Sequence, residues 1–238
     1  MTTSSTSVAM TTSPASSANP ELVARVAQNL ATLRARIAST GREAASIRIV
    51  AVTKTFGVDA VRAAVDNGLD HLGENYVDEL EIKFAQSRDL DISWHFLGAL
   101  QSNKIARVAR CADVLATVSR TKELEKIASG DAPPALYVQV DYTGGATRNG
   151  AEPRDVAALV ERARALELDV RGLMTVAAPD PALARVAFAN LAALRSDLGL
   201  VECSMGMSDD LELACELGTS EIRIGRALFG ERVAVTAP

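Results

Sequence analysis

The chain has 238 residues, of which 48% are hydrophobic, 23% charged and only 4% aromatic. This length and composition suit one well-buried core, and either one α/β barrel or two small domains would fit. A formal net charge of −5 gives no global basic field, so we expect no nucleic acid and no anionic membrane surface as a partner. No apolar run reaches the roughly 18 residues that a membrane-spanning helix needs.

The cysteines and histidines show no metal-binding or disulfide pattern. Cys111, Cys203 and Cys215 lie far apart without a Cys-x-x-Cys pair, which favours reduced thiols in a cytoplasmic protein. The two histidines, His71 and His95, have no second ligand at a recognisable spacing. We therefore predict no metal site.

Residues 1–19 contain mainly Ser, Thr, Ala and Met and have no charged side chain. Such a segment cannot bury enough surface to offset its ordering entropy, so we predict a disordered tail. It lacks the basic start of a secretory signal and the arginines of a mitochondrial transit peptide. The remaining residues, 20–238, are expected to form a single domain.

The domain begins with one amphipathic helix, because Pro20 suits a first helical turn and apolar residues recur at three- and four-residue spacing. They are Val23, Val26, Leu30, Leu33 and Ile37. Eight short apolar runs follow, each of strand length: 47–53, 71–73, 94–97, 114–118, 136–140, 170–174, 201–205 and 222–224. Between them lie stretches with a helical pattern, such as 58–67, 103–111, 153–166, 181–198 and 209–217.

Strands that alternate with helices form right-handed βαβ units and a parallel sheet. Eight such units close into a (β/α)₈ barrel of the TIM type, here with an extra N-terminal helix. A doubly wound open sheet is the alternative, but no Gly-x-Gly-x-x-Gly follows the first strand. In a barrel, active groups gather at the carboxyl ends of the strands, and the last two loops commonly bind phosphate.

Lys54 comes directly after the first apolar run. Most lysines at such a place pack their aliphatic chain along the protein surface and keep the charged ammonium in water. Partial desolvation, however, lowers the pKa of a lysine ammonium and lets the free amine attack a carbonyl. Lys54 is therefore a candidate nucleophile.

A phosphate site is predicted after the seventh and eighth runs. Gly206 allows a close backbone approach, Ser208 is placed to cap the following helix, and Gly225 leads into a short terminal helix. Free N–H groups and a hydroxyl at a helix start suit a dianion. The alternative is that Ser208 only caps its helix.

Arg223 lies inside the eighth run, where an unpaired charge is costly. It can hydrogen-bond a ring nitrogen of an aldehyde cofactor or form a structural salt bridge to Glu74 or Glu202. His95 is a core histidine or, if it faces the barrel mouth, a cofactor contact. The strand-end residues Asn75, Met174 and Ser204 complete the predicted binding set.

Several motifs occur in one order along the chain: Ala-Val-Thr-Lys54-Thr, Gly73-Glu74-Asn75-Tyr76-Val77, Trp94-His95-Phe96-Leu97-Gly98, Gln101-Ser102-Asn103-Lys104, Gly172-Leu173-Met174, Ser204-Met205-Gly206-Met207-Ser208-Asp209-Asp210 and Arg223-Ile224-Gly225. This ordered set resembles the pyridoxal phosphate homeostasis protein family. The resemblance covers nearly everything after the tail.

The resemblance implies a single barrel of the alanine-racemase type that holds pyridoxal 5′-phosphate (PLP) as a Schiff base on Lys54. It also implies that Ser208 and the Gly225 loop hold the phosphate, that Arg223 faces the pyridine nitrogen and that Asn75 lines the pocket. Two positions depart from the family pattern. Arg226 replaces the usual threonine after Arg-Ile-Gly, and Arg148 lies where Lys-x-Gly is more common.

Members of that family are regarded as carriers or regulators of vitamin B6 and amino-acid balance, which implies apo PLP-dependent enzymes and free amino acids as partners. We expect a monomeric carrier without robust catalysis. Racemisation needs an acid/base group on each face of the substrate, and Lys54 serves only one. In related racemases the second comes from a further domain, which we do not expect here. The alternative is a small PLP-dependent amino-acid racemase that recruits Tyr76 or a water.

Overall fold

The computed structural model describes residues 18–144 and 149–231. Residues 1–17 of the predicted tail, and Arg148, lie outside this described part. At the boundary, Ala18 is buried and the Asn19 side chain accepts a 3.0 Å hydrogen bond from the backbone N–H of Glu21. Asn19 thus caps the first helix, with Pro20 at its first position.

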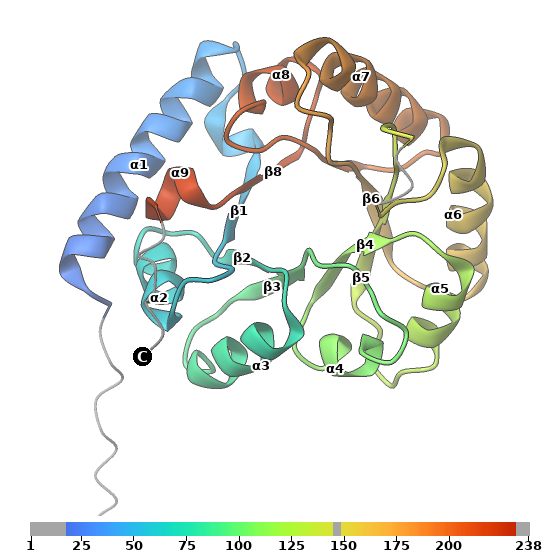
Figure 1. The fold of residues 1–238 in the computed structure, drawn as a ribbon, viewed down its shortest axis with the longest axis horizontal. Helices are drawn as coiled ribbons and strands as arrows, with labels where there is room; N and C mark the ends of the chain where they lie inside the picture. The colour runs from blue at the N-terminus through green and yellow to red at the C-terminus, as the bar shows by residue number, and fades with distance from the viewer. Residues whose placement is uncertain (1–17, 145–148, 232–238) are drawn as a thin grey trace, which may run out of the picture.

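Eight parallel strands form a closed barrel in which each strand pairs with its neighbours in chain order and the last pairs with the first (Figure 1). The predicted (β/α)₈ barrel is confirmed. The strands are β1 (Arg48–Val52), β2 (His71–Glu74), β3 (Ser93–Phe96), β4 (Val114–Val118), β5 (Ala135–Gln139), β6 (Val170–Met174), β7 (Glu202–Ser204) and β8 (Glu221–Ile224).

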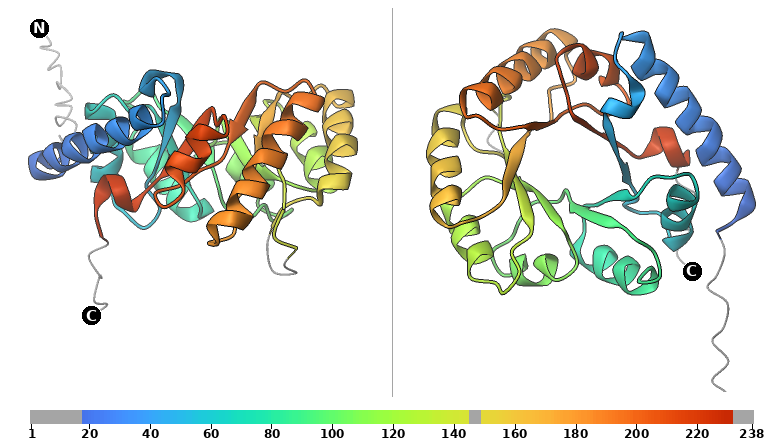
Figure 2. Two further views of the ribbon diagram at one scale, coloured as in Figure 1. Left: turned by 90° about the horizontal axis from the view of Figure 1, so that it is seen from above. Right: turned by 180° about the vertical axis from the view of Figure 1, so that it is seen from behind.

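Helices surround the barrel and follow the strands, as both end-on views show (Figures 1 and 2). They are α1 (Pro20–Ser39), α2 (Val58–Asp66), α3 (Val77–Gln86), α4 (Ile105–Ala109), α5 (Thr121–Ala128), α6 (Val156–Ala165), α7 (Pro181–Asp197), α8 (Leu211–Glu216) and α9 (Arg226–Phe229). Two short 3₁₀ turns, Ala44–Ser46 and Pro153–Asp155, precede β1 and α6.

The extra helix α1 packs against α2, α8 and α9, and it lies outside the ring beside α9 in Figure 1. Its apolar stripe, which includes Val26, Leu30, Leu33 and Ile37, is buried there. Burial of this stripe explains the helical spacing seen in the sequence. Among the described residues, no helix is long and apolar enough to cross a membrane.

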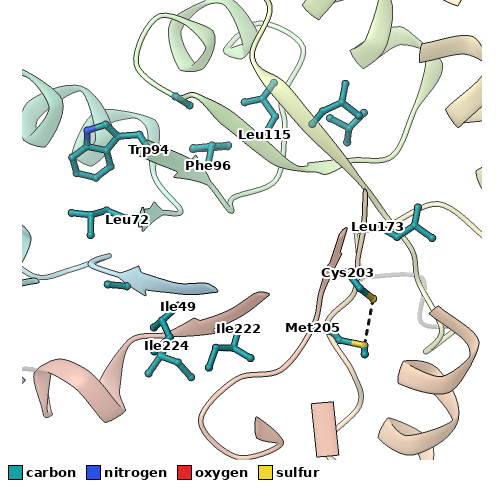
Figure 3. Close-up of a cluster of buried hydrophobic side chains, with 14 of the residues drawn as sticks. Ile49, Leu72, Trp94, Phe96, Leu115, Leu173, Cys203, Met205, Ile222 and Ile224 are labelled. Carbon is teal, nitrogen blue, oxygen red and sulfur yellow. Dashed lines mark hydrogen bonds between the residues drawn. The ribbon is translucent and has the colours of Figure 1, made fainter. Parts of the chain in front are cut away.

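Side-chain alternation divides the core into two layers. Outward-facing strand residues such as Ile49, Leu115 and Ile222 join the large cluster beneath the helices (Figure 3). Inward-facing residues form a smaller apolar cluster that includes Tyr137 and Met174. Polar side chains, among them Arg48, His95 and Glu221, occupy another part of the barrel interior.

Candidate functional site

A cavity of about 700 Å³ opens where the strands end. Its walls combine charged, polar and apolar side chains from β1, β6 and β8 and from the segments that follow β1, β2, β3, β6, β7 and β8. They are Val52, Lys54, Phe56, Asn75, Leu97, Met174, Val176, Met207, Ser208, Asp209, Arg223, Gly225, Arg226 and Glu231. This volume lies within the range of small-molecule and cofactor sites.

Lys54 reaches this cavity from a tight turn directly after β1. The turn is closed by a 3.0 Å hydrogen bond from the Phe56 N–H to the Thr53 carbonyl. Thr55 inside it has φ 66, a left-handed conformation that is uncommon for a β-branched residue. Lys54 is half-buried and lines the cavity.

Arg223 lies at the base of the cavity with only 6% of its surface exposed. Its guanidinium donates from Nη1 to Ser204 Oγ and from Nη2 to the Thr175 carbonyl, each at 2.8 Å. Burial lowers the pKa of Arg223 from its ordinary value. The salt bridges considered from the sequence do not form, because Glu74 binds Lys83 and Glu202 binds Arg48.

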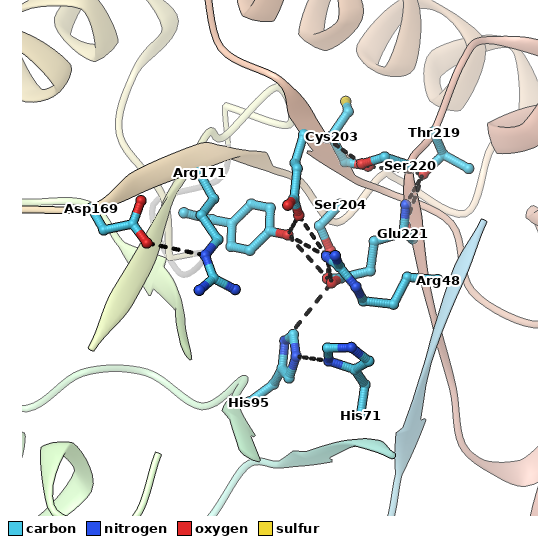
Figure 4. Close-up of polar contacts among 12 residues, drawn as sticks. Arg48, His71, His95, Asp169, Arg171, Cys203, Ser204, Thr219, Ser220 and Glu221 are labelled. Atoms are coloured by element: carbon cyan, nitrogen blue, oxygen red, sulfur yellow. Dashed lines mark hydrogen bonds and ion pairs between the residues drawn. The ribbon is translucent and has the colours of Figure 1, made fainter. Parts of the chain in front are cut away.

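Ser204 lies beneath the cavity and supports Arg223 from within the barrel. Its hydroxyl donates a 2.6 Å hydrogen bond to Glu221 Oε1, while Glu221 Oε2 lies 3.3 Å from Arg48 Nη1. Figure 4 shows these groups converging in the barrel interior. Ser204 is not among the lining residues of the cavity. Ser204 was predicted to bind the cofactor, but in the structure its hydroxyl instead accepts a hydrogen bond from Arg223.

His95 also lies away from the cavity. Its ring Nε2 is 2.9 Å from His71 Nδ1, and its Nδ1 is 3.8 Å from Glu221 Oε2, in the layer that contains the first residues of β1, β2 and β8 (Figure 4). Burial, followed by the charges of neighbouring groups, lowers the pKa of His95 to about 3. The expectation that His95 faces the barrel mouth does not fit this geometry, because its side chain projects into the interior one layer below Leu97.

The loop after β7 carries Ser208, although not as a helix cap. The helix α8 begins at Leu211 with Asp210 at the N-cap position, and Asp210 Oδ1 instead accepts a 2.5 Å hydrogen bond from the Met207 N–H. From α1, Arg36 Nη2 donates to the Ser208 carbonyl at 2.9 Å. The expected N-cap is therefore wrong, but Ser208 still lines the cavity on an anchored loop.

Of the eight predicted site residues, six share the cavity: Lys54, Asn75, Met174, Ser208, Arg223 and Gly225. The apolar walls of the cavity, Val52, Phe56, Leu97 and Val176, were not among the predicted site residues. Alternation along β3 could have identified Leu97, since it lies two residues beyond His95 on the same face. Phe56 and Val176 follow irregular backbone, which gives no such periodic signal.

The cavity thus combines an amine, a guanidinium, a hydroxyl and an amide. Within the described residues, no group of histidine, cysteine and carboxylate side chains could hold a metal ion. The donor set suits a ligand with a carbonyl for Lys54, an acceptor for Arg223 and an anionic group near Ser208.

Comparison with known proteins identifies the class of protein. Residues 23–233 match the family that is described as "Alanine racemase, N-terminal domain". The pyridoxal phosphate homeostasis protein of Pseudomonas aeruginosa is 40% identical over 220 residues, which cover 87% of this chain and 96% of that protein. Its counterpart from Vibrio cholerae is 37% identical over 227 residues with the same coverage. The chain belongs to the pyridoxal phosphate homeostasis protein family.

Solved structures agree with this assignment. PipY of Synechococcus elongatus, solved with PLP bound, has 32% sequence identity and a TM-score of 0.76, covering 86% of this chain and 100% of that chain. Alanine racemase of Corynebacterium glutamicum has 18% identity and a TM-score of 0.68, covering 91% of this chain but 63% of that chain. The racemase comparison extends to the fold alone.

Proposed function

We propose that this protein binds PLP in the carboxyl-end cavity through a Schiff base on Lys54 and serves intracellular vitamin B6 homeostasis. The observation that carries the proposal is that Lys54, Arg223 and Ser208 line one cavity of about 700 Å³. PLP supplies an aldehyde carbon with which a lysine amine forms a C=N bond, releasing water. The relatives' names and the PLP in the PipY structure support the same ligand.

The residues present fit this ligand at three separate points. Lys54 supplies the amine, Arg223 offers an N–H that can donate a hydrogen bond to a ring nitrogen without giving up its proton, and Ser208 offers a hydroxyl to the phosphate. The backbone near Gly225 and the amide of Asn75 complete the wall.

Arg223 favours the carrier over the enzyme. Because a guanidinium keeps its proton, a ring nitrogen that it contacts stays unprotonated and draws electrons only weakly from a substrate carbon. A racemase also needs a second acid/base group opposite Lys54. Tyr76, the candidate for that role, is 55% exposed and is not one of the residues that line the cavity.

A carrier must also release its cargo. An incoming amine, from a free amino acid or from the lysine of an apo PLP-dependent enzyme, takes over the covalent link from Lys54 by exchange. Arg226 and Glu231 line the cavity and are exposed, so the cavity is accessible to such an amine from that side. Three unpaired cysteines fit a reducing compartment such as the cytoplasm.

Borohydride reduction followed by peptide mapping tests the covalent link. We expect wild-type protein with PLP to be labelled at Lys54 and Lys54→Ala to lose the label while retaining its fold by circular dichroism. Lys104→Ala is the matched control, because Lys104 is also half-buried but lies outside the cavity lining. Unchanged labelling of Lys54→Ala would refute the assignment.

A second experiment separates carrier from racemase. The PLP-loaded protein is incubated with an amino acid in deuterated water, and deuterium at Cα is followed by mass spectrometry. We expect exchange no faster than with free PLP. Rapid, sustained exchange that depends on Lys54 would establish the enzyme instead.

A further inference from the structure

A second lysine, Lys83 of α3, is buried next to the turn that carries Lys54. Its side chain is only 4% exposed, which is unusual for lysine. Its Nζ donates to the Thr53 carbonyl at 2.7 Å, to Glu74 Oε1 at 2.6 Å and to Glu79 Oε2 at 3.2 Å. The three N–H donors of the ammonium therefore each have an acceptor.

The same two carboxylates also bind the Lys54 turn directly. Glu74 Oε1 accepts a 2.6 Å hydrogen bond from Thr53 Oγ1, and Glu79 Oε2 accepts a 2.7 Å hydrogen bond from the Thr55 N–H. The residues on both sides of Lys54 are thus fixed by Lys83, Glu74 and Glu79, which we call the Lys83 clamp. Its members come from β2 and α3, so the clamp ties two elements to the end of β1.

The turn needs such support because Thr55 has φ 66. A β-branched residue in the left-handed region is strained and persists only where surrounding contacts impose it. Glu79 imposes it by accepting from the Thr55 N–H. Without this bond, the turn would relax and the stem of Lys54 would start from another direction.

We propose that the Lys83 clamp is a positioning device that sets the rate at which Lys54 reacts with an aldehyde ligand, without itself contacting the ligand. The inference rests on the proposed function. Lys83 is not a second nucleophile here, since its N–H donors are all engaged and it lies outside the cavity lining. Covalent reaction depends steeply on how the amine is oriented, whereas phosphate binding at Ser208 does not involve this turn.

Two substitutions at Glu79 provide the test, because its side chain is 31% exposed and tolerates change. Glu79→Ala removes the acceptor for the Thr55 N–H, and Glu79→Gln keeps a carbonyl acceptor in the same place. Lys83→Met removes the central cation. Arg42→Met is the matched control: Arg42 also donates to two backbone carbonyls, those of Cys215 and Thr219, but before β8 at the opposite end of the barrel.

Three measurements on the full chain are compared. Amide hydrogen exchange at Thr55 and Phe56 in the cofactor-free protein reports the turn itself. The rate constant of borohydride-trapped attachment of PLP reports the reactivity of Lys54. The dissociation constant of pyridoxamine 5′-phosphate, which has no aldehyde, reports non-covalent binding.

For Glu79→Ala we expect faster Thr55 exchange and attachment slowed by roughly tenfold, the equivalent of one charge-assisted hydrogen bond. The dissociation constant of pyridoxamine 5′-phosphate should stay within about twofold, and Glu79→Gln should recover most of the rate. Lys83→Met should slow attachment further, and Arg42→Met should not. If Lys83→Met does not fold, the Glu79 pair decides alone.

Wild-type attachment rates in Glu79→Ala would overturn the proposal. So would a parallel loss of pyridoxamine 5′-phosphate affinity, because the effect would then be a general loss of structure. If borohydride traps no PLP on wild-type Lys54, the proposed function fails. Amide hydrogen exchange at Thr55 and Phe56 then still decides whether the clamp holds the turn. If wild type is labelled and the clamp variants match it, the clamp fails and the proposed function stands.

Discussion

Arg223 donates a 2.8 Å hydrogen bond from Nη1 to Ser204 Oγ, and this bond joins the base of the cavity to the polar interior of the barrel. Ser204 passes the contact on by donating to Glu221 Oε1 at 2.6 Å. Both side chains are buried. The orientation of the cavity guanidinium is therefore set from below, by residues that do not line the cavity.

Ser204→Ala should destabilise the protein, because it leaves a buried guanidinium N–H and a buried carboxylate oxygen each without a partner. We expect a loss of about 1–3 kcal/mol in the free energy of unfolding, measured by urea denaturation. Ser196→Ala is the control. Ser196 Oγ donates to the Ala192 carbonyl on the exposed face of α7, and its loss should cost less than about 0.5 kcal/mol. Equal effects of the two variants would contradict the supporting role of Ser204.

His95 should make stability fall in mild acid. Burial lowers its folded pKa to about 3, whereas the unfolded chain has an ordinary value of about 6.5. Between these values the unfolded state binds the additional proton, so stability is fully present above about pH 6.5 and decreases as pH falls. For one such histidine the loss between pH 7 and pH 5 is about 2 kcal/mol.

The measurement compares urea unfolding of wild type and His95→Gln at several pH values in that window. Between pH 7 and pH 5, we expect the free energy of unfolding of His95→Gln to fall by about 2 kcal/mol less than that of wild type. His71 has a lowered pKa for the same reason, burial, and the chain has two histidines. The double variant with His71→Gln therefore removes all histidine titration and provides the reference slope. Identical slopes in wild type and the double variant would exclude the effect.

The barrel was predictable because eight short buried runs alternate with helical stretches, and strand ends mark the site in this fold. Lys54 and Arg223 could be identified for that reason. The helix α3 was not among the helical stretches named from the sequence. Its buried face includes Lys83, which is 4% exposed, and its surface includes Ile82, which is 57% exposed. The apolar and polar residues of α3 therefore do not separate into a buried and an exposed face, which is the pattern by which a helix is recognised in a sequence.

The depth of a side chain within the barrel was the main property that the sequence could not provide. His95 and Leu97 share one face of β3, yet only Leu97 reaches the cavity. That distinction depends on the stagger between neighbouring strands, in which His95 pairs with Gly73 and Val114. The Lys83 clamp was equally inaccessible, since a lysine within a helix normally faces water.

Gly98→Ala should disturb the wall of the cavity formed by Asn75. A Cβ at Gly98 would lie 2.0 Å from the Asn75 carbonyl oxygen, so the end of β2 must move. We expect weaker binding of pyridoxamine 5′-phosphate by roughly tenfold and a loss of about 1–3 kcal/mol in stability. Gly57→Ala is the control, because a Cβ there meets nothing within 4 Å although Gly57 follows the Lys54 turn. Unchanged affinity in Gly98→Ala would show that the wall adapts.

Arg226 should add a salt-sensitive contribution to phosphate binding. It is exposed and lines the cavity together with Ser208 and Gly225. An exposed guanidinium attracts a phosphate by about 1 kcal/mol, or roughly fivefold in affinity, and salt screens this attraction. Arg226→Thr should therefore weaken binding of pyridoxamine 5′-phosphate by about that factor at low ionic strength and by little near 1 M salt. Arg226→Lys keeps the charge and should retain the salt dependence of wild type. Parallel salt dependences for wild type and Arg226→Thr would mean that the phosphate is held by Ser208 and the loop backbone alone.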